Sequence, residues 1–151
     1  MTTTTTTMNR THEVRARHNT LRLAALTTGA ALPANLAVFG LARARDVRFQ
    51  FPQPGSSGNQ IVTVGAVAAV TVMTMIVGWA LAARSASHHR PSLRTMAIIG
   101  AAVAVLSTIA PLTIDAGLSV KITLASLHLI TGGLYITGIA ALRRTNKQAI
   151  Q

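Results

Sequence analysis

Four long stretches of the chain contain no Asp, Glu, Lys or Arg and consist mainly of Ala, Val, Leu and Ile. They cover residues 23–42, 61–83, 95–114 and 122–142. About twenty such residues, wound as a helix, match the ~30 Å hydrocarbon core of a bilayer. The polar segments between them are too short to form a separate soluble domain. The pattern therefore predicts an all-α protein: an integral membrane bundle of four transmembrane helices.

Polar segments flank this transmembrane domain, which is predicted over residues 23–142. Residues 1–22 begin with a run of threonines and continue with basic residues, so we expect a disordered basic N-terminal tail. Residues 143–151 are expected to form a polar C-terminal tail. The apolar run at 23–42 is longer than the ~7–15 residues of a signal-peptide core, so we expect an uncleaved anchor there.

The distribution of charge predicts the orientation. The chain has 14 Lys and Arg against 3 Asp and Glu, a net charge of +11. Most of the basic residues precede the first span, separate the second from the third, or follow the fourth, and basic loops stay cytoplasmic. We therefore expect a plasma-membrane protein with both termini in the cytoplasm. Its basic flanks would contact anionic lipid headgroups, and no nucleic acid partner is expected.

The segment between the first two spans, residues 43–60, is the one sizeable external loop that the pattern predicts. Apolar and polar residues alternate from Val47 to Phe51, which is a weak strand-like pattern that Pro and Gly then break. We expect Phe49 and Phe51 to lie at the outer headgroup boundary. The external turn between the last two spans is only a few residues long, which predicts a tight helical hairpin.

Little catalytic chemistry is available to the chain. There is no cysteine, which excludes disulfides, thiol catalysis and cysteine-ligated metals. The only acidic residues are Glu13, Asp46 and Asp115, all outside the spans, which excludes hydrolysis by two paired carboxylates. His88 and His89 lack the third ligand that a metal site needs. We therefore expect no metal and no cofactor.

Polar side chains inside the spans are the best functional clues, because hydrocarbon offers them no partners. His128 shares a helical face with Tyr135 in the fourth span, and this face is expected to point into the bundle. Asn35 in the first span lies at nearly the same depth as His128, about 10 Å from the outer end at 1.5 Å per residue. Ser107 and Thr108 of the third span fall at the same level. These five residues form the candidate ligand-binding cluster.

Two interpretations of this cluster stay open. Its members could hold the helices together through interhelical hydrogen bonds, which average only ~0.6 kcal/mol but fix which faces meet. Alternatively, they could line a small polar cavity that takes a ligand or a proton from outside. The opposite face of the fourth span is expected to face lipid; it carries Leu127, Ile130, Leu134 and Thr137.

Two features bear on how the helices pack. Pro33 and Pro111 each lack the N–H that would bond the carbonyl four residues earlier, so each is expected to bend its helix. Pairs of small residues four positions apart allow close helix contact. Such pairs are Gly65 with Ala69, Gly100 with Ala104, and Gly133 with Thr137.

Short motifs lie along the chain from about Ala30 to Arg144. They are Ala34-Asn35-Leu36, Val47–Pro52, Gly78-Trp79-Ala80-Leu81, Leu106–Leu112, and Lys121, Leu124 and Leu127-His128-Leu129 before the exit at Gly138–Arg144. Together they resemble a family of small four-helix membrane proteins from actinobacteria, known only as a domain of unknown function. The resemblance implies the four-span fold. It implies no activity, since none is assigned to the family.

Three classes of function remain. The first is a non-enzymatic accessory or ligand-binding bundle, which works in the lipid bilayer by packing against a second copy or another membrane protein. The second is a small oligomeric transporter that uses His128, since no span contains the Asp or Glu that proton-coupled carriers typically place mid-membrane. The third, a membrane-embedded enzyme, lacks a second titratable partner within reach. We therefore expect a protein that is not an enzyme.

Overall fold

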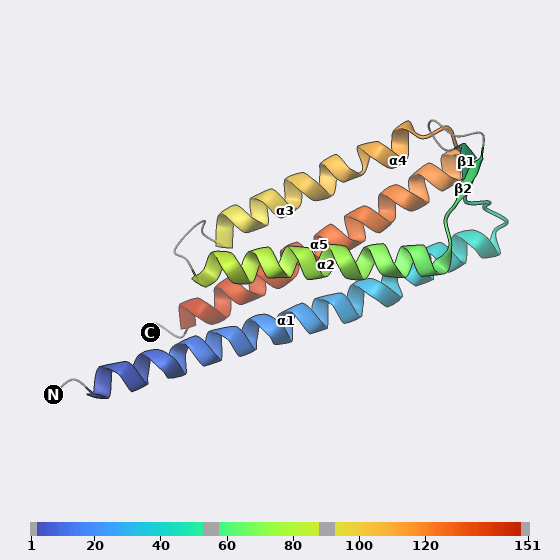
Figure 1. Ribbon diagram of the computed structural model, residues 1–151. Helices are drawn as coiled ribbons and strands as arrows, with labels where there is room; N and C mark the ends of the chain where they lie inside the picture. The colour runs from blue at the N-terminus through green and yellow to red at the C-terminus, as the bar shows by residue number, and fades with distance from the viewer. Residues whose placement is uncertain (1–2, 53–57, 88–92, 149–151) are drawn as a thin grey trace.

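Five helices and a small β-hairpin make up the computed structural model, which describes residues 3–52, 58–87 and 93–148 (Figure 1). The helices are α1 (Thr3–Ala44), α2 (Val64–Ser87), α3 (Leu93–Ser107), α4 (Ile109–Thr113) and α5 (Leu118–Gln148). Four helical segments are long and apolar enough to cross a bilayer. These are Arg17–Ala44, Val64–Ser85, Leu93–Thr113 and Leu118–Thr145. The four predicted spans are therefore confirmed.

The N-terminal segment differs from the expected disordered tail. Helix α1 begins at Thr3 and continues without a break into the first span, passing through Pro33. A helix of 42 residues is about 63 Å long, roughly twice the hydrocarbon thickness. Its first part projects beyond the other helices, as Figure 1 shows. At the other end of the chain, α5 also continues helically past residue 143, as far as Gln148.

The third span is divided by a break near Pro111. Helix α3 ends at Ser107, Thr108 lies in a turn, and α4 begins at Ile109. Pro111 has no N–H to donate to the carbonyl of Ser107, so the regular hydrogen-bond ladder cannot continue through this turn. The predicted bend at Pro111 is thus a short interruption of the helix.

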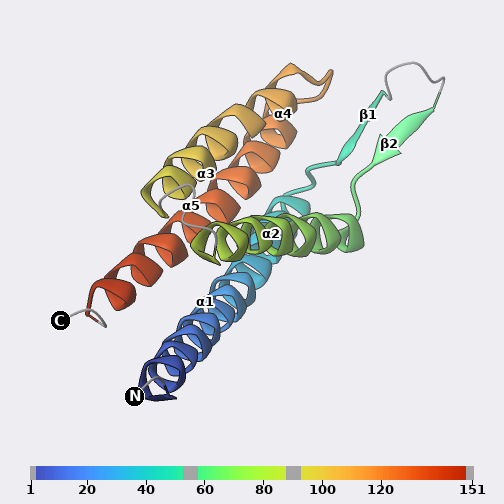
Figure 2. The ribbon, with the colours of Figure 1, turned by 60° about the vertical axis from the view of Figure 1, so that its left-hand side comes forward.

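Helix α5 lies at the centre of the bundle. It packs along α1 on one side and α3 on the other, while α2 packs mainly against α1. Figure 2 shows α3 beside α5, and α2 against α1. Because α5 has neighbours on two sides, more of its surface is buried than a single inward face would allow. Leu127 is buried and Leu134 packs against the core, so the prediction that they face lipid was wrong, whereas Thr137 is exposed.

A two-stranded hairpin covers one end of the bundle. Strands β1 (Gln50–Pro52) and β2 (Asn59–Ile61) are antiparallel, with Phe51 opposite Gln60. Phe49 and Phe51 are 3% and 9% exposed, and they belong to one core cluster with Phe39 of α1. They therefore cap the helices at this end of the bundle. We call this the hairpin end.

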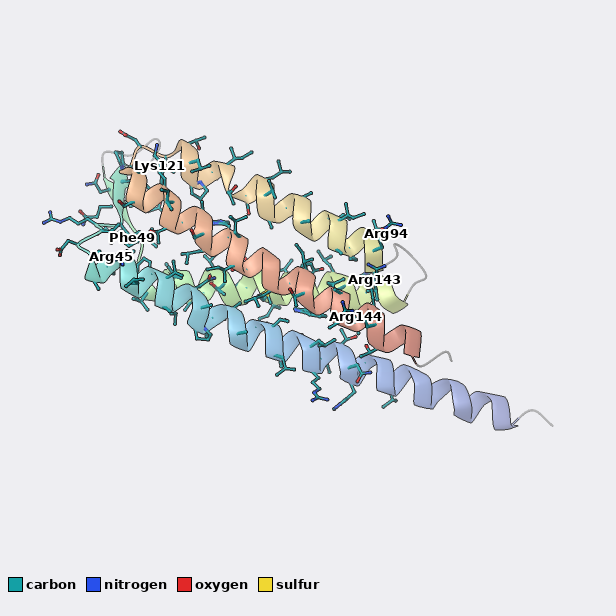
Figure 3. The ribbon with its side chains drawn as sticks, turned by 180° about the vertical axis from the view of Figure 1, so that it is seen from behind. Arg45, Phe49, Arg94, Lys121, Arg143 and Arg144 are labelled. Carbon is teal, nitrogen blue, oxygen red and sulfur yellow. The ribbon has the colours of Figure 1, made fainter. Side chains whose placement is uncertain are left out.

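The opposite end, where α1 begins and α5 finishes, is the terminal end. Figure 3 shows Arg45 and Lys121 at the hairpin end and Arg94, Arg143 and Arg144 at the terminal end. Between the two charged ends, large apolar side chains cover the outside of the helices; examples are Val70, Ile76, Ile98, Val105 and Leu129. So wide an apolar surface would be exceptional in water, and it fits a lipid environment.

The interior contains two apolar clusters. One lies toward the terminal end and includes Ala31, Met75 and Trp79. The other lies toward the hairpin end and includes Phe39 and Val67. Along α1 and α2, the buried residues between these clusters are Asn35 and Thr71. Both are polar, and they belong to the site described next.

Candidate functional site

Asn35 is the centre of a buried polar contact among three helices. Its side chain is 1% exposed. The Nδ2 group donates to Thr71 Oγ1 of α2 at 2.9 Å and to Thr131 Oγ1 of α5 at 2.8 Å. We call these three residues the Asn35 node. The node ties α1, α2 and α5 together in the middle of the bundle.

The hydroxyl groups of the node explain how the amide is oriented. Thr71 Oγ1 donates its proton to the carbonyl of Val67 at 2.8 Å, and Thr131 Oγ1 donates to the carbonyl of Leu127 at 2.9 Å. Each hydroxyl group donates its only proton to a backbone carbonyl of its own helix, so it can act only as an acceptor toward the amide. The two N–H groups of Asn35 are therefore directed at the two hydroxyl groups.

The remaining polar atom of the node has no partner. Asn35 Oδ1 is buried and accepts no hydrogen bond within the described part of the chain. Leaving a buried acceptor unsatisfied costs about 1–3 kcal/mol. Oδ1 is therefore an acceptor to which no described residue donates.

His128 lies half-buried on α5, and its contact is within its own helix. Nδ1 lies 2.8 Å from the carbonyl of Leu124, to which it can donate a hydrogen bond. No hydrogen bond joins His128 to Asn35, both of which are described. Nε2 of His128 makes no hydrogen bond within the described part of the chain.

The register of α3 on α5 sets His128 level with the break in the third span. Gly132 of α5 contacts Ala104 of α3, and Tyr135 contacts Gly100. The helices are antiparallel, so one turn back from Gly132 along α5 corresponds to one turn forward from Ala104 along α3. That step aligns His128 with the end of α3, where Ser107 and Thr108 lie.

Ser107 and Thr108 make only local hydrogen bonds through their hydroxyl groups. Ser107 Oγ donates to the carbonyl of Ala104 at 3.0 Å, and Thr108 Oγ1 donates to that of Val105 at 2.6 Å. The expected layer of polar groups from the first, third and fourth spans is therefore not joined by hydrogen bonds. Asn35 bonds instead to the second and fourth spans.

Tyr135 lies apart from the Asn35 node, toward the terminal end. Its ring fits between two glycines: a Cβ built on Gly100 would lie 2.6 Å from Tyr135 Cε1, and one on Gly78 would lie 3.0 Å from Cε2. The hydroxyl donates to the carbonyl of Gly78 at 3.2 Å, and the ring meets Trp79 edge-on. This role is helix packing between α2, α3 and α5.

A second interhelical hydrogen bond was not predicted from the sequence. Trp79 Nε1 donates to Thr27 Oγ1 at 3.0 Å, and this indole is buried. Thr71 and Thr131 of the node were also missed. Threonines are frequent in the spans and bond readily to their own backbone, so the sequence gives no signal that separates these three from the others.

No metal site is found among the described residues, where no group of three or more His, Asp or Glu is placed to hold an ion. His88 and His89 lie outside the described residues. Asp115 and Lys121 are described, and no ion pair joins them. The polar groups available to a ligand inside the spans are thus neutral acceptors, above all Asn35 Oδ1.

The fold and this site define a class: a small multi-pass membrane protein with four apolar helical spans, three of which meet at a buried amide. The chain belongs to the family of unknown function DUF6069, whose model matches residues 15–147. A comparison with curated proteins finds no match, and a comparison with solved structures finds none either.

Proposed function

We propose that this protein is a non-enzymatic membrane bundle that acts by binding, and that the Asn35 node is where a small ligand is held. The observation that carries the proposal is the buried Oδ1 of Asn35, which lacks a donor although it lies among three helices. A ligand with a hydroxyl or amide group could donate to this oxygen. An apolar body on such a ligand would suit the apolar clusters on either side.

The chemistry of the spans favours binding over catalysis. The three acidic residues of the chain lie outside the spans, and the node contains one amide and two hydroxyl groups, none of which titrates near neutral pH. A membrane enzyme would need a titratable pair or a cofactor at the reacting atoms. In an accessory role, the protein would bind a second copy of this chain or another membrane protein.

We also infer the orientation from charge. By sequence, ten basic residues belong to the segments at the terminal end and four to those at the hairpin end. The positive-inside rule then favours a terminal end in the cytoplasm and a hairpin end outside, in the plasma membrane. In this orientation the hairpin end, where Phe49 and Phe51 cap the helices, faces the exterior.

Extraction of the bound ligand tests the proposal. The protein is purified in mild detergent, the bound small molecules are released with solvent, and they are identified by mass spectrometry. We expect a compound with a hydroxyl or amide group on the wild type and on Thr74→Val, a control at an exposed threonine of α2. Asn35→Val should lose it. Equal amounts on a folded Asn35→Val variant would contradict the proposal.

One observation favours a transporter as the second candidate. Nε2 of His128 bonds to no described residue and lies in a membrane span, so it could accept a proton. A transporter predicts proton flux into liposomes that contain the pure protein, and loss of that flux in His128→Ala. If the protein only binds a ligand, liposomes with and without the protein should show the same proton flux.

A further inference from the structure

The terminal end carries a group of arginines that no acidic residue neutralises. Arg94 lies in the first turn of α3, while Arg143 and Arg144 lie near the end of α5. Figure 3 shows all three at the same end of the molecule. Arg94 and Arg144 are exposed and Arg143 is half-buried. No ion pair or hydrogen bond from these three side chains is found within the described part of the chain.

The packing of α3 on α5 brings these arginines to one level. The register that pairs Gly132 with Ala104 and Tyr135 with Gly100 is antiparallel. Two further turns along both helices lead to Arg143 on α5 and to the first residues of α3. In agreement, Leu93 and Leu142, which precede Arg94 and Arg143, pack in the same apolar cluster.

The three acidic residues of the chain lie on segments away from this position. Asp46 follows the end of α1, and Asp115 lies between α4 and α5, so both are at the hairpin end. Glu13 lies in α1, which runs antiparallel to α5 with Asn35 beside Thr131 and Thr27 beside Gly138. Continued in this register, α5 ends before it comes level with residue 13. Within the described ranges, the three arginines therefore have no acidic partner, and an external anion would complement their charge.

An apolar strip on α3 continues from Arg94 toward the middle of the helix. Ile98 and Val105 follow Arg94 by one and three helical turns, so the three lie on one face of the helix. Both apolar side chains are 59% exposed. A positive charge next to an apolar strip is complementary to an amphiphile with a negative headgroup. A free phosphate ion would contact the arginines but not the apolar strip.

From this arrangement we infer a binding site for an anionic phospholipid at the terminal end, on the exposed face of α3 beside α5. Arg94, Arg143 and Arg144 bind the headgroup phosphate, and one acyl chain lies along Ile98 and Val105. Guanidinium groups suit this role because they donate two parallel hydrogen bonds to phosphate oxygens. The site is separate from the Asn35 node and does not depend on the proposed function.

Native mass spectrometry of the detergent-purified protein tests this site, with phosphatidylglycerol and phosphatidylcholine of identical acyl chains as probes. We expect the wild type to retain phosphatidylglycerol in preference. The variant with Arg94→Gln, Arg143→Gln and Arg144→Gln should lose roughly tenfold or more in affinity for it, given the attraction of each arginine near an anionic headgroup. Equal retention of both lipids by the wild type would overturn the site.

The control removes the same charge at the other end. Arg43→Gln, Arg45→Gln and Arg48→Gln should leave the preference within about twofold of the wild type, if local geometry and not net charge decides. An equal loss in this control would overturn the site. The triple Arg→Lys variant at the terminal end keeps the charge but loses the paired hydrogen bonds, so its loss of preference should be smaller than that of the triple Gln variant.

Two further arms keep the test decisive. If the triple Gln variant does not fold, Arg94→Gln alone is used, because this exposed side chain makes no contact that folding needs. It should weaken phosphatidylglycerol binding roughly fivefold. Soluble glycerol phosphate at the same concentration should not displace the lipid. If it does, the site recognises a free phosphate and the lipid assignment is wrong.

Discussion

Asp46 is the only non-glycine residue in the described ranges whose backbone has a positive φ, at 59°. It follows the end of α1, where Val47 N donates to the carbonyl of Ala42 at 3.1 Å and Asp46 N donates to that of Arg43 at 3.0 Å. This is the Schellman pattern, in which glycine is the preferred residue at the left-handed position. The turn directs Val47 back to Ala42 and the cluster below the hairpin.

We predict that Asp46→Gly stabilises the protein by up to about 1 kcal/mol, because glycine adopts this conformation without steric cost. Asp46→Ala should be less stable than the wild type, since alanine keeps the Cβ and lacks the local hydrogen bonding that aspartate offers. Denaturation in mixed micelles measures both variants. An Asp46→Gly variant less stable than the wild type would contradict this account of the turn.

A double-mutant cycle tests the contact between Asn35 and Thr131. Interhelical hydrogen bonds in membranes average about 0.6 kcal/mol and reach about 1.7 kcal/mol, so the coupling between Asn35→Val and Thr131→Val should fall in that range. The matched cycle with Thr74→Val, at an exposed threonine, should give no coupling. Zero coupling in the first cycle would show that the node does not hold α1 to α5.

At the scale of elements, the contact of α3 with α5 depends on one of two adjacent glycines. A Cβ on Gly132 would collide with Ala104 of α3, whereas a Cβ on Gly133 would meet nothing within 4 Å. Of the small-residue pairs in the sequence, Gly100 with Ala104 does lie at a helix interface. Gly65 with Ala69 and Gly133 with Thr137 are exposed.

We therefore predict opposite effects for these neighbours. Gly132→Ala should destabilise the protein by about 1–3 kcal/mol, because extra volume in a packed contact forces the helices apart. Gly133→Ala should be neutral or stabilising by up to about 1 kcal/mol, since alanine favours the helix. The same micelle denaturation compares the two. A Gly132→Ala variant as stable as Gly133→Ala would contradict the register of α3 on α5.

The four spans could be predicted because a run of about twenty uncharged residues has few alternatives in a bilayer. The candidate site could be predicted only in part. A helical face tells where a side chain such as Asn35 points, but it does not tell which helix lies opposite. The neighbours of Asn35 depend on how α1 packs against both α2 and α5. The partners Thr71 and Thr131 could therefore not be identified from the sequence.

At the scale of the whole molecule, one apolar band lies between two charged ends, and α1 begins at the same end of the molecule at which α5 finishes (Figure 1). With four spans, a segment at the hairpin end and one at the terminal end must lie on opposite sides of the membrane. The absence of cysteine from the sequence makes this easy to test, since a single introduced cysteine is the only thiol.

Labelling of single cysteines in intact cells with a membrane-impermeant maleimide is the most direct test of this arrangement. Three exposed positions are compared: Asn59→Cys in β2, Ala102→Cys in α3 and His18→Cys in α1. We predict that position 59 reacts at once, that position 18 reacts only after the membrane is opened, and that position 102 stays protected by lipid throughout. Equal labelling of positions 18 and 59 in intact cells, or rapid labelling of position 102, would contradict a bundle that crosses the bilayer four times.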